Sequence, residues 1–144
     1  FYGAEKRGGI ARASCILSDG KIASPVLSSA DSSVVMSADS LEAGSRNLRD
    51  GGLLLVNSSL VPDSAITPEL EQRVSVLRVP ATAIAERRGN VRIANMVMLG
   101  ALAKKTGAIV LENLEEALAA FFPGAKARVI PLNIEGIVAG AAAV

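Results

Sequence analysis

A short run of purely apolar residues constrains the fold of this chain more than any other feature. Residues 53–56 read Leu-Leu-Leu-Val, and they follow the glycine pair Gly51 and Gly52. A continuous apolar run of this length, without the alternation of a half-exposed strand, is typical of a strand buried on both faces of a parallel sheet. We therefore expect a central strand here, and we interpret Gly51 and Gly52 as the stop of a preceding helix.

The rest of the sequence alternates between strand-like and helix-like segments. Apolar β runs occupy residues 33–36 and 74–79, and a loop punctuated by Pro62 and Pro68 precedes the second of them. Helix signals cover residues 39–48, 82–88, 93–105 and 111–121, and the last three end at Gly89, Gly107 and Pro123-Gly124. Strands that alternate with helices predict right-handed crossovers, a mostly parallel sheet and a three-layer α/β fold.

The beginning of the chain carries a hairpin signal. Residues 11–17 lead into Asp19-Gly20, and a second short apolar run ends at Pro25. Asp-Gly between two apolar runs favours a tight β-turn because glycine accepts positive φ. We therefore expect a hairpin-like β segment before the parallel sheet, with Cys15 as a small core residue in its first strand.

Composition limits the chemistry that this chain can perform. The 144 residues include no histidine and a single cysteine, and half of them are apolar, which predicts one domain over residues 1–144. Without histidine there is no Ser-His-Asp triad or Cys-His pair, and one cysteine cannot hold an iron–sulfur cluster or form an internal disulfide. We therefore predict no catalytic or metal-binding residues, and we expect a reducing, cytoplasmic compartment.

Charge and hydropathy narrow the range of partners. Fifteen basic and fourteen acidic residues leave a formal net charge of +1, which gives no field for nucleic acid or an anionic membrane. No window reaches the roughly 18 apolar residues of a membrane span. We therefore expect a soluble protein that binds neither nucleic acid nor membrane.

A glycine-rich loop near the start is the first candidate binding site. Arg7 is followed by Gly8 and Gly9 and preceded by Tyr2 and Gly3. Such a loop offers backbone amides, a guanidinium that binds anions in a bidentate manner, and an aromatic platform, so it can hold phosphate or carboxylate. The alternative is a flexible turn that leads into the first strand.

The polar triplet after the central strand is the second candidate. Asn57, Ser58 and Ser59 stand where a buried parallel strand ends, and ligands of open α/β sheets bind outside these ends. The alternative is local capping, because asparagine and serine side chains routinely satisfy loop backbones. We discount Ser18-x-x-Lys21 as a nucleophile motif because its Asp-Gly centre places the pair across a turn.

Five segments, in this order, resemble one protein family. They are residues 2–11 (YGAEKRGGIA), 18–25 (SDGKIASP), 51–59 (GGLLLVNSS), 79–82 (VPAT) and 94–101 (ANMVMLGA). Together they are similar to the gamma subunit of 2-oxoacid:ferredoxin oxidoreductases. The residues of the first and third segments are most similar to those of the 2-oxoglutarate branch. The pyruvate, branched-chain and indolepyruvate branches stay open.

The resemblance implies a division of labour within a hetero-oligomeric complex. Partner subunits would bind thiamine diphosphate and iron–sulfur clusters, decarboxylate the 2-oxoacid and pass electrons to ferredoxin, while coenzyme A accepts the acyl group. This chain would be the Rossmann-like gamma component, inactive alone, that serves assembly and coenzyme A access. Tyr2, Gly3, Arg7, Gly8, Gly9 and the triplet Asn57-Ser58-Ser59 are the expected cofactor contacts.

One departure from the family pattern concerns the start of the chain. The family opens with a strand and a Gly-x-Gly-Gly-Gln-Gly turn before the Tyr-Gly segment, and this sequence begins at Phe1 with neither. We therefore expect that the first strand is missing from this sequence. The alternative to the whole assignment is a stand-alone α/β module that binds a nucleotide or another small anion through the same residues.

Overall fold

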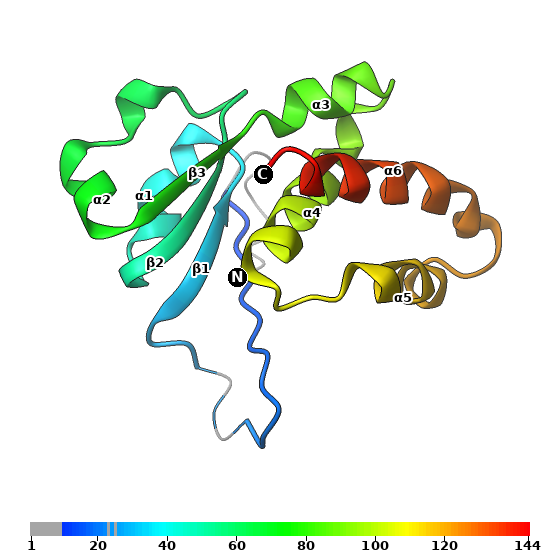
Figure 1. The fold of residues 1–144 in the computed structure, drawn as a ribbon, viewed down its shortest axis with the longest axis horizontal. Helices are drawn as coiled ribbons and strands as arrows, with labels where there is room; N and C mark the ends of the chain where they lie inside the picture. The colour runs from blue at the N-terminus through cyan, green and yellow to red at the C-terminus, as the bar shows by residue number, and fades with distance from the viewer. Residues whose placement is uncertain (1–9, 23, 25) are drawn as a thin grey trace, which may run out of the picture.

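A parallel sheet forms the centre of the fold. The computed structural model of the chain describes residues 10–22, 24 and 26–144. Within them, β1 (Ala30–Val35), β2 (Leu48–Asn57) and β3 (Ser75–Val79) pair in the order β1-β2-β3, and both pairings are parallel (Figure 1). Leu54, Leu55 and Val56 of the central strand are 0% exposed. The expected central strand and the parallel sheet are confirmed.

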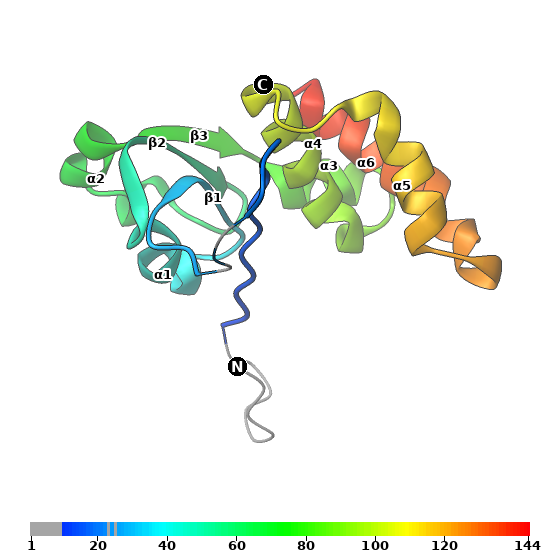
Figure 2. The same cartoon turned by 90° about the horizontal axis from the view of Figure 1, so that it is seen from below.

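Helices cover both faces of the sheet (Figures 1 and 2). On one face, Leu55 and neighbouring side chains pack against α3 (Ala81–Arg87), α4 (Ala94–Thr106) and α6 (Ile130–Ala141). On the other face, Leu54 and Val56 pack in a second core with Leu41 of α1 (Leu41–Ser45) and Leu70 of α2 (Pro68–Arg73). Alternate side chains of β2 thus enter two separate cores, which confirms the three-layer architecture.

Two glycines let α4 and α6 cross at very short range. A Cβ atom added to Gly100 would collide with the Ile137 backbone, and one added to Gly140 would collide with the Val97 backbone. This crossing completes the core on the α4 side of the sheet. Helix α5 (Leu114–Phe121) lies beside α6, below it in the view of Figure 1.

Several predicted helices form close to their expected bounds. Helices α3, α4 and α5 fall within or next to residues 82–88, 93–105 and 111–121. Gly107 ends α4 in the left-handed conformation at φ 65°, as expected of a glycine C-cap. Short 3-10 helices precede or join the α-helices: η1 (Ala38–Ser40), η2 (Asp63–Ala65), η3 (Val91–Ile93), η4 (Leu111–Asn113) and η5 (Gly124–Val129).

The predicted hairpin at the beginning of the chain is wrong. Residues 10–22 contain no strand, and Asp19-Gly20 forms only a bend. Ile10, Leu17 and Ile22 are all exposed, so neither arm has an apolar face to bury against a partner. Cys15 is likewise exposed and not a core residue. A turn signal alone does not produce paired strands without such burial.

The interpretation of Gly51 and Gly52 as a helix stop is also wrong. Helix α1 ends at Ser45, and β2 already begins at Leu48, so both glycines lie inside the strand. The register of β1 with β2 jumps there from Ala30↔Leu48 to Ser32↔Leu53, and Gly51 takes a φ of +73°. The glycines therefore permit a bulge in the strand, because only glycine adopts this backbone conformation at low cost.

The segment expected as a loop between Pro62 and Pro68 continues into a helix. Pro68 is the first residue of α2, and the Thr67 hydroxyl accepts a hydrogen bond from the Leu70 N–H at 3.3 Å. Thr67-Pro68 is thus a helix start, a signal that sequence reasoning missed. Arg73 near the end of α2 donates to the carbonyl oxygens of Ser45 and Leu48, which holds the short α1 against the start of β2.

Among the described residues, no helix combines the length and the apolar character that a membrane span requires.

Candidate functional site

The candidate site at the strand ends is centred on Asn57. This residue is the last of β2 and is 0% exposed. Its Nδ2 group donates to the Met36 carbonyl oxygen, just beyond β1, at 3.3 Å, and to Thr82 Oγ1 in α3 at 2.9 Å. A single amide group therefore connects the ends of two strands to the helix that follows the third.

The carbonyl oxygen of the same side chain is also engaged. Asn57 Oδ1 accepts from the backbone N–H of Thr82 at 3.3 Å and from that of Ser59 at 3.4 Å. Both donors and the acceptor of the amide are thus in use, which is how a buried polar side chain avoids a desolvation penalty. Asn57 offers no further hydrogen-bonding group to a ligand in this arrangement.

The two serines complete the junction with α3. The Ser58 backbone N–H donates to the Val79 carbonyl oxygen at 2.9 Å, and Ser59 Oγ accepts from the Ala83 N–H at 3.1 Å. The N-terminal N–H groups of a helix at the end of a parallel strand are the usual anion donors of such folds. Here the side chains of Asn57 and Ser59 occupy two of them, at Thr82 and Ala83. We name residues Asn57, Ser59 and Thr82 the strand-end clasp.

The clasp corresponds to the capping alternative that the sequence left open. The structure gives each of its members hydrogen-bond partners within the protein, and the expected role of Asn57, Ser58 and Ser59 as ligand contacts stays a prediction. Ser58 is half-buried and Ser59 is exposed. The partners Thr82 and Met36 lie far from Asn57 in sequence, so local pattern alone did not identify them.

The other predicted contacts fall outside the described residues. Tyr2, Gly3, Arg7, Gly8 and Gly9 all precede Ile10, where the description begins. Their proposed role in binding an anion therefore rests on residue chemistry alone.

A cavity of about 1090 Å³ lies beside β1 and extends to Leu53 of β2 and Leu102 of α4, and none of the three clasp residues lines it. Its lining includes residues 10–17, Ser33 of β1 and the end of α4 at Lys105. Arg12 and Arg49 add cationic groups to this lining, and Arg49 Nε pairs with Asp31 Oδ1 at 2.9 Å. The cavity therefore has a mixed lining of apolar, polar and charged side chains, and the sequence pattern did not predict it.

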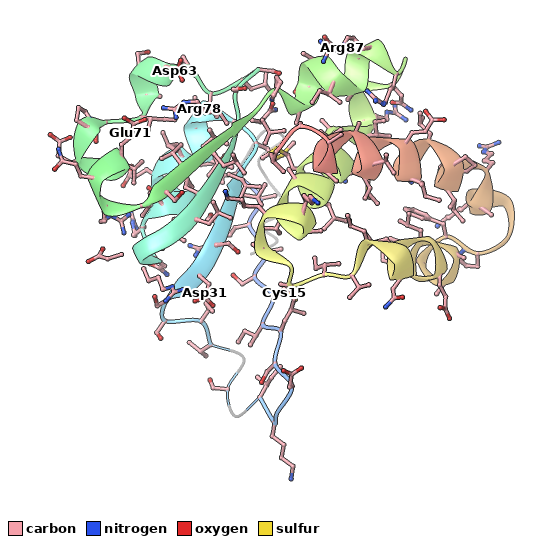
Figure 3. The ribbon with its side chains drawn as sticks, viewed as in Figure 1. Cys15, Asp31, Asp63, Glu71, Arg78 and Arg87 are labelled. Atoms are coloured by element: carbon pink, nitrogen blue, oxygen red, sulfur yellow. The ribbon has the colours of Figure 1, made fainter. Side chains whose placement is uncertain are left out.

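An exposed ion-pair cluster braces the opposite edge of the sheet (Figure 3). Arg78 of β3 donates to Glu71 Oε1 at 2.5 Å and to Asp63 Oδ1 at 2.7 Å. Donation to Glu71 and Asp63 raises the pKa of Arg78 above its ordinary value. Because the cluster joins β3 to α2 and η2 at the surface and uses all three charges internally, we assign it to fold support and not to catalysis.

The residues that the structure describes were compared with the ligand sets of metal sites by their arrangement in space. Among the residues that the structure describes, no group of three or more carboxylate or cysteine side chains is arranged to hold a metal ion. Iron–sulfur clusters require several cysteine thiolates, and the sequence holds only Cys15. These residues therefore do not fit an iron–sulfur cluster.

Fold and composition do not assign the chain to a protein family, whereas comparison with known proteins does. Residues 1–143 match the family described as pyruvate ferredoxin/flavodoxin oxidoreductase. The chain belongs to this family, which confirms the resemblance seen in the sequence.

Three relatives illustrate the similarity. The 2-oxoglutarate synthase subunit KorC of Methanothermobacter marburgensis is 40% identical over 119 residues, which cover 81% of this chain and 64% of that protein. The ketoisovalerate oxidoreductase subunit VorA of Methanothermobacter thermautotrophicus is 32% identical over 141 residues, covering 97% of this chain and 28% of that protein. The crystal structure of the keto/oxoacid ferredoxin oxidoreductase gamma subunit from Geobacter sulfurreducens PCA superimposes with a TM-score of 0.65 at 26% identity, covering 76% of this chain and 61% of that one. The chain thus spans about 64% of the length of the 2-oxoglutarate synthase subunit that it matches.

Proposed function

We propose that this chain is a gamma-type subunit of a 2-oxoacid:ferredoxin oxidoreductase complex that acts on 2-oxoglutarate. The complex would decarboxylate the 2-oxoacid oxidatively, transfer the acyl group to coenzyme A and pass the released electron pair to ferredoxin. The observation that carries the substrate assignment is the 40% identity to a 2-oxoglutarate synthase subunit, against 32% to a ketoisovalerate oxidoreductase subunit. The ordered sequence segments point to the same branch.

The residues of this chain support a role outside the redox chemistry. The sequence holds one cysteine and no histidine, so thiamine diphosphate and the iron–sulfur clusters belong to partner subunits in this proposal. Bound there, those groups would supply decarboxylation and electron transfer. The isolated chain should be inactive, and its contribution is assembly and access of coenzyme A. The single cysteine also favours a reducing, cytoplasmic location.

Copurification tests the proposal directly. Tagged full-length protein recovered from its native cell should bring down a thiamine-dependent subunit and a subunit with ferredoxin-type cysteine motifs. Mass spectrometry of the eluate identifies these subunits from their sequences. Recovery of the tagged chain without either of them would contradict the proposal. A stable monomer that binds a nucleotide in calorimetry would favour the stand-alone binding module instead.

The proposed role in coenzyme A access predicts that substitution of Arg7 changes the KM for coenzyme A. The proposal places its guanidinium, with the amides of Gly8 and Gly9, at the anionic phosphates of coenzyme A. Arg7→Ala in the assembled enzyme should raise the KM for coenzyme A by about tenfold or more, with a smaller change in kcat, because a charged hydrogen bond to the bound cofactor is lost.

A matched control keeps this result specific. Arg46→Ala removes a different arginine, which is exposed and pairs with Glu42 on α1 at 2.7 Å, and it should leave the KM for coenzyme A unchanged. An unchanged KM in the Arg7 variant would remove the proposed contact while leaving the subunit assignment in place.

A further inference from the structure

The outer edge of β1 has no strand beside it in the part of the chain that the structure describes. The sheet has the order β1-β2-β3, so β1 is paired on one side only. Val34 of β1 is 38% exposed, whereas Leu55, its register partner on β2, is 0% exposed. An edge strand presents a row of unpaired N–H and C=O groups with which a further strand can pair. The outer edge of β1 is therefore suited to strand addition.

The cavity beside β1 reaches both faces of this edge. Ser33 and Val34 both line it, and successive side chains of a strand point to opposite faces of the sheet. Leu102 of α4 lines it on one face, and Gly44 of α1 lines it on the other. Both helix layers therefore extend past the last strand of the sheet. A space of about 1090 Å³ between two helix layers, beside an open edge, has the position of a further strand in a three-layer fold.

Residues 10–17 lie along the same cavity and all of them line it. Figures 1 and 2 show them as an extended stretch beside β1. They form no strand, and Ile10 and Leu17 are 57% and 64% exposed, although the sequence predicts a strand over residues 11–17. A strand placed between this stretch and β1 would pair with both of them. It would thus supply the partner that the predicted strand requires.

The lining determines the character of such a strand. It would be covered by α4 on one face and by α1 on the other, and strands of this kind in parallel sheets are continuous apolar runs. A parallel neighbour of β1 needs a connection of a dozen or more residues, and 29 residues precede Ala30. A second copy of this chain does not fit, because its own β1 lies between the same helix layers, which would collide with α1 and α4.

Relatives of this chain have enough additional length for such a strand. The match to the 2-oxoglutarate synthase subunit of Methanothermobacter marburgensis covers 64% of that protein, so more than a third of it lies outside the matched residues. The cavity lining begins at Ile10 and ends at Ile109, so the first end of this chain is nearer to it in sequence than the last. A segment that joins the chain before Phe1 is therefore the better occupant.

We propose that a strand from the segment of the full-length protein that precedes Phe1 inserts between β1 and residues 10–17, parallel to β1. Parallel pairing places the end of this strand beside Met36, whose carbonyl oxygen accepts the hydrogen bond from Asn57 of the clasp. The loop that follows the strand then joins the edge of the sheet at which open α/β folds bind their ligands. This inference does not depend on the substrate or the partner subunits proposed above.

Photo-crosslinking of the full-length protein identifies the occupant. The protein would be expressed in cells supplied with photo-leucine, whose diazirine links to neighbouring groups under light, and the linked peptides would be identified by mass spectrometry. Leu99 and Leu102 line the cavity, so both should link to an apolar segment before Phe1. Leu60 is 53% exposed and does not line the cavity, so it should give no such link. Links from Leu99 and Leu102 only to residues 1–144, or to a different polypeptide, would overturn the proposal.

Hydrogen exchange of the same full-length protein gives an independent measurement. The amides of residues 10–17 should exchange about 100-fold or more slowly than those of an unstructured peptide, because hydrogen-bonded strand amides exchange only when the strand opens. Residues 18–22 are exposed and do not line the cavity, so they are the control and should exchange rapidly. Exchange of residues 10–17 as fast as that of residues 18–22 would contradict the inserted strand, whether or not the protein recovers partner subunits.

Discussion

Replacing Gly100 or Gly140 with alanine should destabilise the protein by about 3 kcal/mol or more. Each added methyl group would collide with backbone atoms of the facing helix, near Ile137 or Val97. A flexible side chain can rotate away from a methyl group, whereas here the two helices must move apart and open the core beneath them. Urea denaturation of the full-length protein measures the effect as a lower midpoint at unchanged slope.

Two other glycines provide graded controls for the helix crossing. Gly136 also lies on α6, but an added Cβ would meet the Met96 Cβ at 3.2 Å, so Gly136→Ala should cost less than either crossing variant. Gly20 has open surroundings, with Ser18 Oγ at 3.8 Å, and Gly20→Ala should change the free energy of unfolding by less than about 0.5 kcal/mol. A Gly100→Ala midpoint equal to that of Gly20→Ala would contradict the close crossing.

Removing the side chain of Asn57 should have the second large effect. Asn57→Ala eliminates the hydrogen bonds to Met36, Thr82 and Ser59 and leaves the half-buried Met36 carbonyl oxygen and Thr82 N–H without these partners. We expect a loss of roughly 2–4 kcal/mol in the free energy of unfolding, since each unsatisfied buried group costs about 1–3 kcal/mol. Ser59→Ala, at an exposed position with a single hydrogen bond to Ala83, should cost less than about 1 kcal/mol.

Asn57→Asp keeps the shape of the Asn57 side chain but introduces an ionisable group, so it separates the effect of shape on stability from that of charge. Burial raises the pKa of the introduced carboxyl group in the folded state above its unfolded value of about 3.9. Folding favours the protonated form, so the stability deficit of the variant relative to the wild type should be smallest below about pH 4 and grow as the pH rises through the folded-state pKa. The deficit of Asn57→Ala relative to the wild type should stay constant over this range. Wild-type stability of Asn57→Asp at pH 7 would contradict the buried clasp.

The elements that local sequence determines were predictable. The strand at residues 53–56 follows from an apolar run that has no other stable environment, and α4 ends where Gly107 permits a left-handed residue. The failures involve partners that lie far away in sequence. Gly51 and Gly52 look like a helix stop until the register of β1 requires a bulge. Asp19-Gly20 looks like a hairpin turn, although the described residues 10–22 form no strand on either side of it.

The candidate site shows the same limit. The end of a parallel strand correctly marked Asn57 as a residue of interest, but its role depends on Thr82 and Met36, which the fold brings to it from two other segments. The crossing of α4 and α6 could not be predicted from the sequence either. Glycine within the apolar tail is a weak helix former, and its small size becomes useful only when a second helix packs against it.

Substrate preference of the purified complex tests the central claim most directly. The assembly isolated through the full-length chain would be assayed for reduction of ferredoxin in the presence of coenzyme A, with 2-oxoglutarate, pyruvate and a branched-chain 2-oxoacid compared under the same conditions. We predict coenzyme A-dependent reduction with a kcat/KM for 2-oxoglutarate at least about tenfold above that of the other two acids. Absence of 2-oxoacid-dependent reduction, or a higher kcat/KM for pyruvate or the branched-chain acid, would contradict the assignment.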